Sequence, residues 1–144
     1  MKFISVDEYL MGRATLSELS PEIIGNINIL IPKVNDLLEI FSEYRSVNSG
    51  LRLDSDHVRI YDEINTKRRK KGLAPVSIPW GSTHLSGEGI DLEDKNDKLK
   101  EFCIKNIHLL KKLGLYMESP EFTDTWCHLQ CRKTKSGLII FKPY

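Results

Sequence analysis

The stretch STHLSGEGID at residues 82–91 is the most informative part of this sequence. Its histidine, His84, precedes a carboxylate, Asp91, by seven positions, and the glycines between them allow the backbone to turn sharply. Apolar residues flank Asp91, which predicts a strand over 89–92 with the carboxylate on the face opposite the apolar side chains. We therefore expect His84, on a loop, to fold back beside Asp91.

A second chemical pattern lies at residues 126–130, which read WCHLQ. Strand alternation places Trp126, His128 and Gln130 on one face and the neighbouring cysteines on the other. A third pattern, SGLR, ends in Arg52 at the end of an expected strand. Two histidines and one carboxylate suit a catalytic Zn²⁺ whose fourth position stays open. The alternatives are that both histidines are structural, that Arg52 is a surface charge and that Trp126 only packs in the core.

Periodicity and end signals predict helices over 21–41 and 96–113 and a short one over 7–12. The first begins at Ser20 and Pro21, a hydroxyl cap followed by proline at the first helical position. Pro32 lies inside its apolar pattern, so we expect a kink or a split there. Gly114 is expected to end the helix over 96–113. Residues 1–20 are predicted to form an N-terminal arm.

Short apolar or alternating runs predict strands over 47–51, 89–92, 115–118, 126–132 and 138–141. Residues 53–82 are the most irregular part, with a short helix near Val58–Ile64 and a solvated basic loop at 67–71. His57 and His108 are assigned to solvent. Because helices and strands segregate along the chain, we predict an α+β fold with a small antiparallel sheet flanked by helices.

Composition narrows the class of protein. With 144 residues, 40% of them hydrophobic, the chain can form one domain over 1–144. A net charge of +1 argues against a nucleic-acid-binding protein. The three cysteines, Cys103, Cys127 and Cys131, are expected to be buried thiols. We expect a monomer made in the cytoplasm, with no signal peptide and no membrane insertion.

Taken together and in this order, the motifs resemble the D-alanyl-D-alanine carboxypeptidase and L-alanyl-D-glutamate endopeptidase family of zinc peptidases. Residues 82–91 are similar to its Ser-x-His-x-x-Gly-x-Ala-x-Asp motif, with Gly89 in place of the alanine. Residues 126–128 resemble its Trp-x-His, and residues 49–52 its Ser-Gly-Tyr-Arg, with Leu51 in place of the tyrosine. Residues 9–13 and 135–137 look like the compact phage-encoded members.

The resemblance implies a Hedgehog/DD-peptidase-like fold and one Zn²⁺ held by His84, Asp91 and His128. It implies that Arg52 binds a substrate carboxylate or the developing oxyanion. We assign Ser82 and Trp126 to the substrate-binding surroundings of these ligands. Ser82 would support the ligands, and Trp126 would shape the substrate cleft.

The catalytic base departs from the commonest family pattern. Many relatives carry a glutamate three residues before the last histidine, where this chain has Thr125, which cannot accept a proton as a base. Other relatives place the acid at the end of the preceding strand, which corresponds to Glu118. We predict Glu118 as the base, with Asp124 and Glu121 as alternatives in the connecting loop.

The function implied is a zinc metallopeptidase that hydrolyses bacterial cell-wall peptidoglycan, in the stem peptide or the cross-link. A phage lysis enzyme, or endolysin, fits the expected lack of a signal, since another phage component would carry it to the wall or periplasm. Whether it is a carboxypeptidase or an endopeptidase stays open. The alternatives are an inactive zinc-binding module and a virion structural component with the same fold. The basic run at 67–71 could also help to dock anionic wall polymer.

Overall fold

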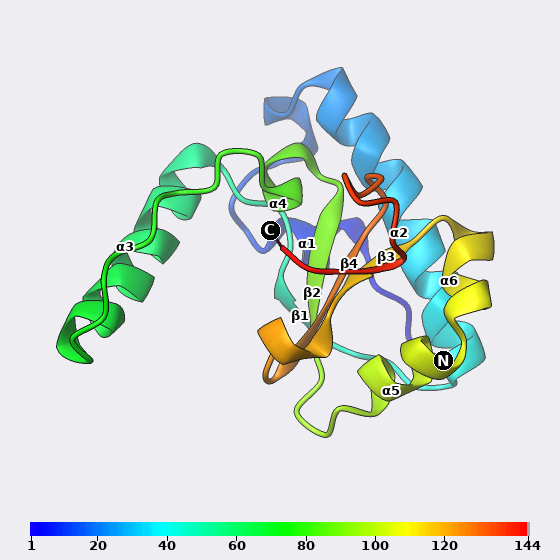
Figure 1. Ribbon diagram of the computed structural model, residues 1–144. Coiled ribbons are helices and arrows are strands. Elements are labelled where there is room, and N and C mark those ends of the chain that lie inside the picture. The colour runs from blue at the N-terminus through cyan, green and yellow to red at the C-terminus, as the bar shows by residue number, and fades with distance from the viewer. Residues whose placement is uncertain (144) are drawn as a thin grey trace.

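The computed structural model describes residues 1–143 and has an α+β fold, in which helices flank a mixed five-stranded sheet (Figure 1). The helices are α1 (Val6–Leu10), α2 (Pro21–Phe41), α3 (Asp54–Lys70), α4 (Thr83–Ser86), α5 (Lys98–Lys105) and α6 (Ile107–Leu113). The strands are β1 (Val47–Ser49), β2 (Gly89–Glu93), β3 (Tyr116–Glu118), β4 (Trp126–Gln130) and β5 (Ile140–Phe141). Single 3₁₀ turns lie at Leu16–Glu18 and Pro120–Phe122.

The strand order is β1-β2-β4-β3-β5, and the prediction of a purely antiparallel sheet is wrong at one pair. β5 runs parallel to β3, whereas every other neighbouring pair is antiparallel. After β4 the chain reverses and passes to the outer edge of β3. A pairing between such distant segments depends on tertiary contacts that the alternation within one strand does not encode.

One face of the sheet forms the hydrophobic core. Its side chains are fully buried: Ile90, Leu92, Met117, Cys127 and Leu129. They belong to one cluster with the buried side of α2, formed by Ile27, Leu30, Ile31, Val34, Leu37 and Leu38. Burial of such a side chain contributes about 1.5–3 kcal/mol, so this face holds the sheet in place. The opposite face carries the polar side chains of β2 and β4, among them Asp91 and His128.

Two long helices test the sequence prediction. α2 runs unbroken from Pro21 to Phe41, so of the two outcomes expected at Pro32 the split does not occur, and its buried residues lie on both sides of the proline. The expected helix over 96–113 is instead two helices, with a break at Asn106. The Asn106 side chain donates to the carbonyl of Phe102 at 2.9 Å, and such local bonds compete with helix continuation. Gly114 ends α6 in the left-handed region, as expected.

Residues 1–20 are more than an arm, because α1 packs into the core. Tyr9 is 0% exposed, and its hydroxyl donates to the carbonyl of Gly89 at 2.8 Å. The Tyr9 carbonyl accepts from the backbone N–H of Leu51 at 3.0 Å. α1 therefore connects the chain after β1 with the start of β2.

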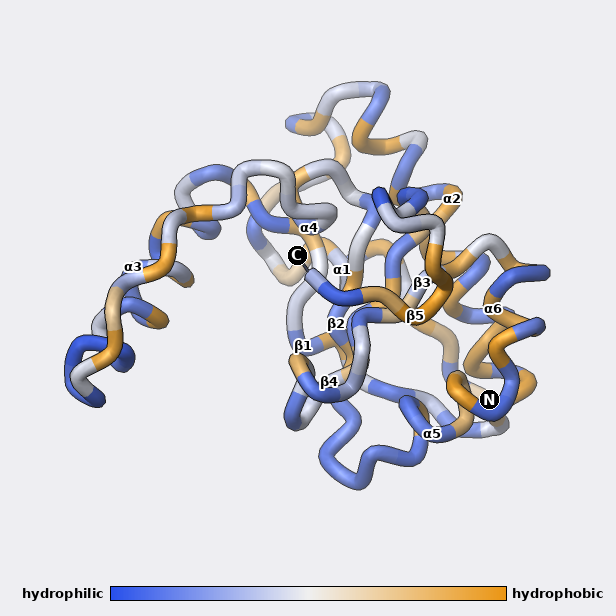
Figure 2. The backbone as a smooth tube through the Cα atoms, viewed as in Figure 1, coloured by the Kyte–Doolittle hydropathy of each residue, from blue (hydrophilic) through white to orange (hydrophobic). Residues whose placement is uncertain are grey.

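α3 replaces most of the irregular region expected over 53–82, and it projects from the sheet with residues 71–80 returning beside it (Figure 1). Asp54 and Asp56 lie in its first turn, where acidic groups favour the helix dipole. The basic run at 67–71 is therefore not a loop. Residues 67–70 form the last turn of the helix, where cations are favoured, and this tip is strongly hydrophilic (Figure 2). None of the helices within residues 1–143 has the length and apolar character needed to cross a membrane.

Candidate metal centre

One residue from each strand lies in a single row across the polar face of the sheet: Ser49, Asp91, His128, Glu118 and Phe141. The pairing of β2 with β4 places Asp91 opposite His128, and that of β3 with β5 places Glu118 opposite Phe141. The β3–β4 pairing, continued by one position, places Glu118 opposite His128. Because paired residues point to the same face, this cross-strand row collects side chains from distant parts of the sequence.

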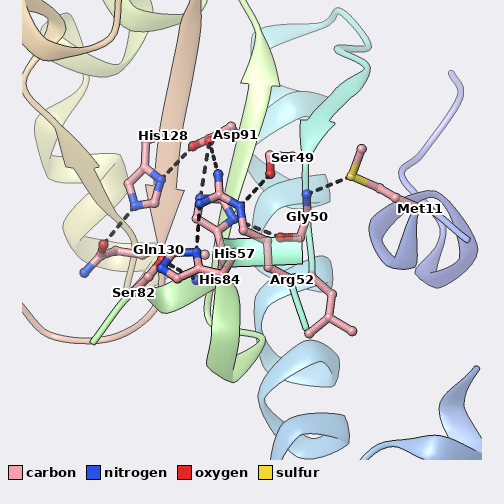
Figure 3. A network of polar contacts seen from close by, with 12 residues as sticks. Met11, Ser49, Gly50, Arg52, His57, Ser82, His84, Asp91, His128 and Gln130 are labelled. Carbon is pink, nitrogen blue, oxygen red and sulfur yellow. Dashed lines mark hydrogen bonds and ion pairs between the residues drawn. The ribbon is translucent and has the colours of Figure 1, made fainter. Parts of the chain in front are cut away.

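The centre of the row, together with α4, brings His84, Asp91 and His128 together (Figure 3). One ligand atom from each residue lies within 4.8 Å of the others. The Asp91 carboxylate is 2.8 Å from His128 Nδ1 and 3.3 Å from His84 Nε2. Both histidines are buried. These three residues could hold a metal ion, as the sequence predicts, and they leave room in a tetrahedral set for one further ligand.

Backbone geometry fixes which nitrogen of His84 faces the centre. His84 Nδ1 is 2.9 Å from the carbonyl oxygen of Gly50, which can only accept, so Nδ1 carries the proton. Nε2 then keeps its lone pair and points at Asp91. Histidine ligands commonly donate the other ring N–H to a carbonyl in this way. The role of Gly50 is not visible in the sequence, because it depends on where β1 lies relative to α4.

Gln130 has the corresponding role for His128. Its Oε1 is 2.9 Å from His128 Nε2, while its Nε2 donates to the carbonyl of Arg132 at 3.0 Å. The amide is therefore oriented with its acceptor toward the imidazole, which leaves Nδ1 as the ligand atom. Alternation along β4 predicted that Gln130 shares a face with His128, but not this contact.

The electrostatics of the three residues suit cation binding. Burial raises the pKa of Asp91, but His84 and His128 outweigh it and hold the pKa well below its usual range. Burial lowers the pKa of His84, although Asp91 opposes it. For His128, burial lowers the pKa, but the hydrogen bond and charge of Asp91 outweigh it and raise the pKa. Because metals bind deprotonated ligands, the affinity of these residues for a cation should depend on pH.

Glu118 is an acidic side chain whose pKa responds to the charges of His128 and Asp91. Burial raises its pKa, the charge of His128 opposes that rise and the charge of Asp91 adds to it. The alternatives, Asp124 and Glu121, are exposed in the connection between β3 and β4. Asp124 lies four residues before His128, about 13 Å along an extended chain. Of the three acids, Glu118 is the one whose strand position lies next to His128.

Arg52 lies at the other side of Asp91 (Figure 3). Its Nε donates to Ser49 Oγ at 3.1 Å, and its Nη2 is 3.8 Å from Asp91 Oδ2. A separation of 3.8 Å is an ion pair and too long for a hydrogen bond. Within residues 1–143, Nη2 thus keeps its N–H groups for another anion. The backbone N–H of Arg52 also donates to the carbonyl of His84 at 3.0 Å. This bond holds the Arg52 backbone next to the segment that carries His84.

Ser82 and Trp126 lie near the centre in different ways. Ser82 caps α4, because its Oγ accepts from the backbone N–H of His84 at 3.3 Å. Ser82 therefore helps to position His84 through its backbone. Trp126 is partly exposed at the start of β4, two residues along the strand from His128 and on the same face.

Gly89, which stands where the resembled motif has alanine, has a local explanation. A Cβ on Gly89 would lie 2.1 Å from Thr83 Oγ1 and 3.2 Å from His128 Cε1. In this chain the side chain of Thr83 occupies the space that an alanine at position 89 would need. The presence of Thr83 therefore requires glycine at position 89.

Two residues of α3 reach the centre without having been predicted there. The assignment of His57 to solvent is wrong, because its side chain is 0% exposed and lies beside Arg52. Tyr61 is half-buried next to it. Burial raises the pKa of Tyr61, Arg52 opposes that rise, and Glu118 adds to it. The spacing of four between His57 and Tyr61 places both on one helix face, but the predicted helix near 58–64 began too late to include His57. His108 is exposed, as expected.

Gly50→Ala should destabilise the fold by about 1–3 kcal/mol, the usual range for overpacking. The added Cβ would lie 2.0 Å from the carbonyl oxygen of Tyr9, so the backbone must shift. The Gly50 carbonyl that orients His84 shifts with it, and the affinity for Zn²⁺ should fall too. Urea unfolding and zinc titration of the same variant measure the two effects.

Gly25→Ala in α2 is the matched control. Nothing lies within 4 Å of a Cβ added there, and alanine is about 0.8–1.0 kcal/mol more favourable than glycine inside a helix. This variant should be as stable as the wild type or more so. Equal unfolding free energies for Gly50→Ala and the wild type would contradict the close approach to Tyr9.

Gln130→Met should weaken the binding of Zn²⁺ roughly 10- to 100-fold, the usual effect of losing a partner of a ligating histidine. Methionine fills similar space but cannot accept from His128 Nε2. Gln130→Glu retains an acceptor and should bind Zn²⁺ at least as tightly as the wild type. Isothermal titration calorimetry compares the three proteins. Identical zinc affinities of Gln130→Met and the wild type would show that the contact between Gln130 and His128 does not contribute to metal binding.

Searches against protein-family models, curated proteins and solved structures found no match for this chain. The chain's own residues therefore support the functional interpretation. Within residues 1–143 they combine three side chains that could hold a cation, a neighbouring carboxylate of raised pKa and a guanidinium whose Nη2 makes no hydrogen bond.

Proposed function

We propose that this protein is a zinc-dependent peptidase with a Hedgehog/DD-peptidase-like fold, acting on the peptides of bacterial peptidoglycan. The observation that supports it most is the cross-strand row, in which Glu118 lies beside His128 while Arg52 lies beside Asp91. The motif resemblance supplies the substrate class. Two imidazoles and one carboxylate are a ligand set typical of catalytic zinc.

In this proposal His84 Nε2, Asp91 and His128 Nδ1 hold the ion. Bound zinc supplies a water of lowered pKa and polarises the scissile carbonyl. Glu118 accepts a proton at its carboxylate and returns it to the leaving amine, a task for which a raised pKa is suited. Arg52 pairs through Nη2 with a carboxylate of the peptide, which orients the bond to be cut.

Mass spectrometry of muropeptides after digestion of purified cell walls tests the proposal. Zinc-loaded protein should remove a terminal residue from stem peptides or convert cross-linked dimers to monomers, and a chelator should stop the reaction until zinc is restored. The first product identifies a carboxypeptidase and the second an endopeptidase. Unchanged muropeptides with protein shown to bind one zinc ion would favour the alternative of an inactive zinc-binding module or a virion structural component.

A further inference from the structure

His57 lies between Arg52 and the segment that returns from the tip of α3. Its Nδ1 is 3.4 Å from Arg52 Nη1, and its Nε2 is 3.0 Å from the carbonyl oxygen of Pro79 (Figure 3). The side chain is 0% exposed. No part of the zinc chemistry described above uses this buried, nucleophilic ring.

The two partners fix one form of the imidazole. A carbonyl oxygen only accepts, so Nε2 must carry a proton toward Pro79. A guanidinium only donates, so Nδ1 must offer a lone pair to Arg52. Only the neutral ring with the proton on Nε2 satisfies both contacts. His57 is therefore built into the site as a hydrogen-bond acceptor for Arg52.

Aromatic neighbours hold the ring in this orientation. The Tyr61 ring lies edge-on to it with centroids 5.0 Å apart, and the Trp80 ring lies 5.6 Å away. Tyr61 comes from the next turn of α3, whereas Trp80 follows Pro79. The Pro79 carbonyl also accepts from the backbone N–H of Ser82 at 3.1 Å, just before α4. The ring thus joins α3 to the turn that carries His84.

We propose that His57 is a positioning residue for Arg52, and this inference rests on the proposed function. With Nε bound to Ser49 and Nη1 bound to His57, the guanidinium cannot rotate, and Nη2 stays beside Asp91, 3.8 Å from its Oδ2, where it would pair with the peptide carboxylate. Substrates with a free carboxylate at that position then gain from a cation that is already oriented. Because the Pro79 carbonyl holds His57, the packing of residues 71–80 against α3 is required for recognition of that carboxylate.

Three variants separate this role from simple packing. His57→Phe keeps the ring between Tyr61 and Trp80 but loses both polar contacts. His57→Asn retains an acceptor near the position of Nδ1, and His57→Gln retains a donor near Nε2 for Pro79. If His57 is only structural, His57→Asn and His57→Gln should behave alike. If it positions Arg52, only His57→Asn should preserve recognition of the peptide carboxylate.

The kinetic test compares matched peptides that end in a carboxylate or a carboxamide. His57→Phe and His57→Gln should raise KM for the carboxylate peptide roughly tenfold or more, as expected for a lost hydrogen bond to a charged group. Their kcat should change by less than about threefold, and His57→Asn should restore KM. The carboxamide peptide should show no such difference between variants. Equal KM values for wild type and His57→Gln would overturn the inference.

A spectroscopic test does not depend on activity. In ¹⁵N spectra of the folded wild type, His57 should have its proton on Nε2, and the Arg52 Nη groups should give separate signals because rotation is restrained. These signals should merge in His57→Gln and stay separate in His57→Asn. A proton on Nδ1 of His57, or merged Arg52 signals in the wild type, would overturn the inference. If the wild type cuts no peptide, the proposed function fails, while these spectra still decide the role of His57.

Discussion

Replacing Glu118 with glutamine should reduce kcat for peptidoglycan peptides by about 10²- to 10⁴-fold, the usual contribution of a general base. Glutamine has the same shape but cannot accept a proton, and it stays opposite His128 in the row. Zinc binding should persist, since Glu118 is not among the three ligands. Muropeptide analysis measures the activity, and calorimetry measures the zinc affinity of the same preparation.

Asp124→Asn is the matched control for this experiment. Asp124 is exposed before β4, and its backbone carbonyl accepts from Lys100 Nζ at 3.0 Å, a contact that the substitution leaves intact. The variant should cleave at the wild-type rate. An active Glu118→Gln together with an inactive Asp124→Asn would assign the base to the loop and reject the interpretation from the sheet.

Asp91→Ala should lower the affinity for Zn²⁺ by at least about 100-fold, more than the loss of an outer hydrogen-bond partner costs. Asp91 is the anionic member of the centre and contacts both histidines and Arg52. Without it, two imidazoles and a nearby cation remain, a poor environment for a divalent ion. Activity should disappear with the metal. Zinc titration followed by the digestion assay tests both consequences.

Glu93→Gln provides the comparison for Asp91→Ala. Glu93 lies on the same strand and the same face, two residues away and opposite Trp126. This variant should bind one zinc ion as tightly as the wild type. Wild-type zinc affinity in Asp91→Ala would remove the basis of the metal centre, provided that circular dichroism shows a folded protein.

The parts of the site that the sequence predicts are those that depend on local geometry. A strand alternates with a period of two, so the flanking residues already show that Asp91 points away from the core. The same rule separates His128 from Cys127 of β4 and from Cys131 just beyond it, and both cysteines are at least partly buried. These predictions need no knowledge of how the strands are arranged.

The parts that local sequence patterns do not predict depend on contacts between distant segments. Nothing near Glu118 in the sequence shows that it lies opposite His128, because that follows from the pairing of β3 with β4. The predicted helix near Val58–Ile64 is the middle of α3, but its full length was missed because charged end turns and a few ring contacts replace the usual apolar stripe. The burial of His57 follows from that helix, so it was missed as well.

The cross-strand row also limits how this protein can vary. Inserting one residue between Trp126 and Cys127 would move the imidazole into the apolar core and bring the Cys127 thiol to the cation side, since alternate positions exchange sides. Lengthening the connections between strands leaves the row intact. Variation in substrate range should therefore accumulate in connecting segments such as residues 71–80, while strand lengths stay constant.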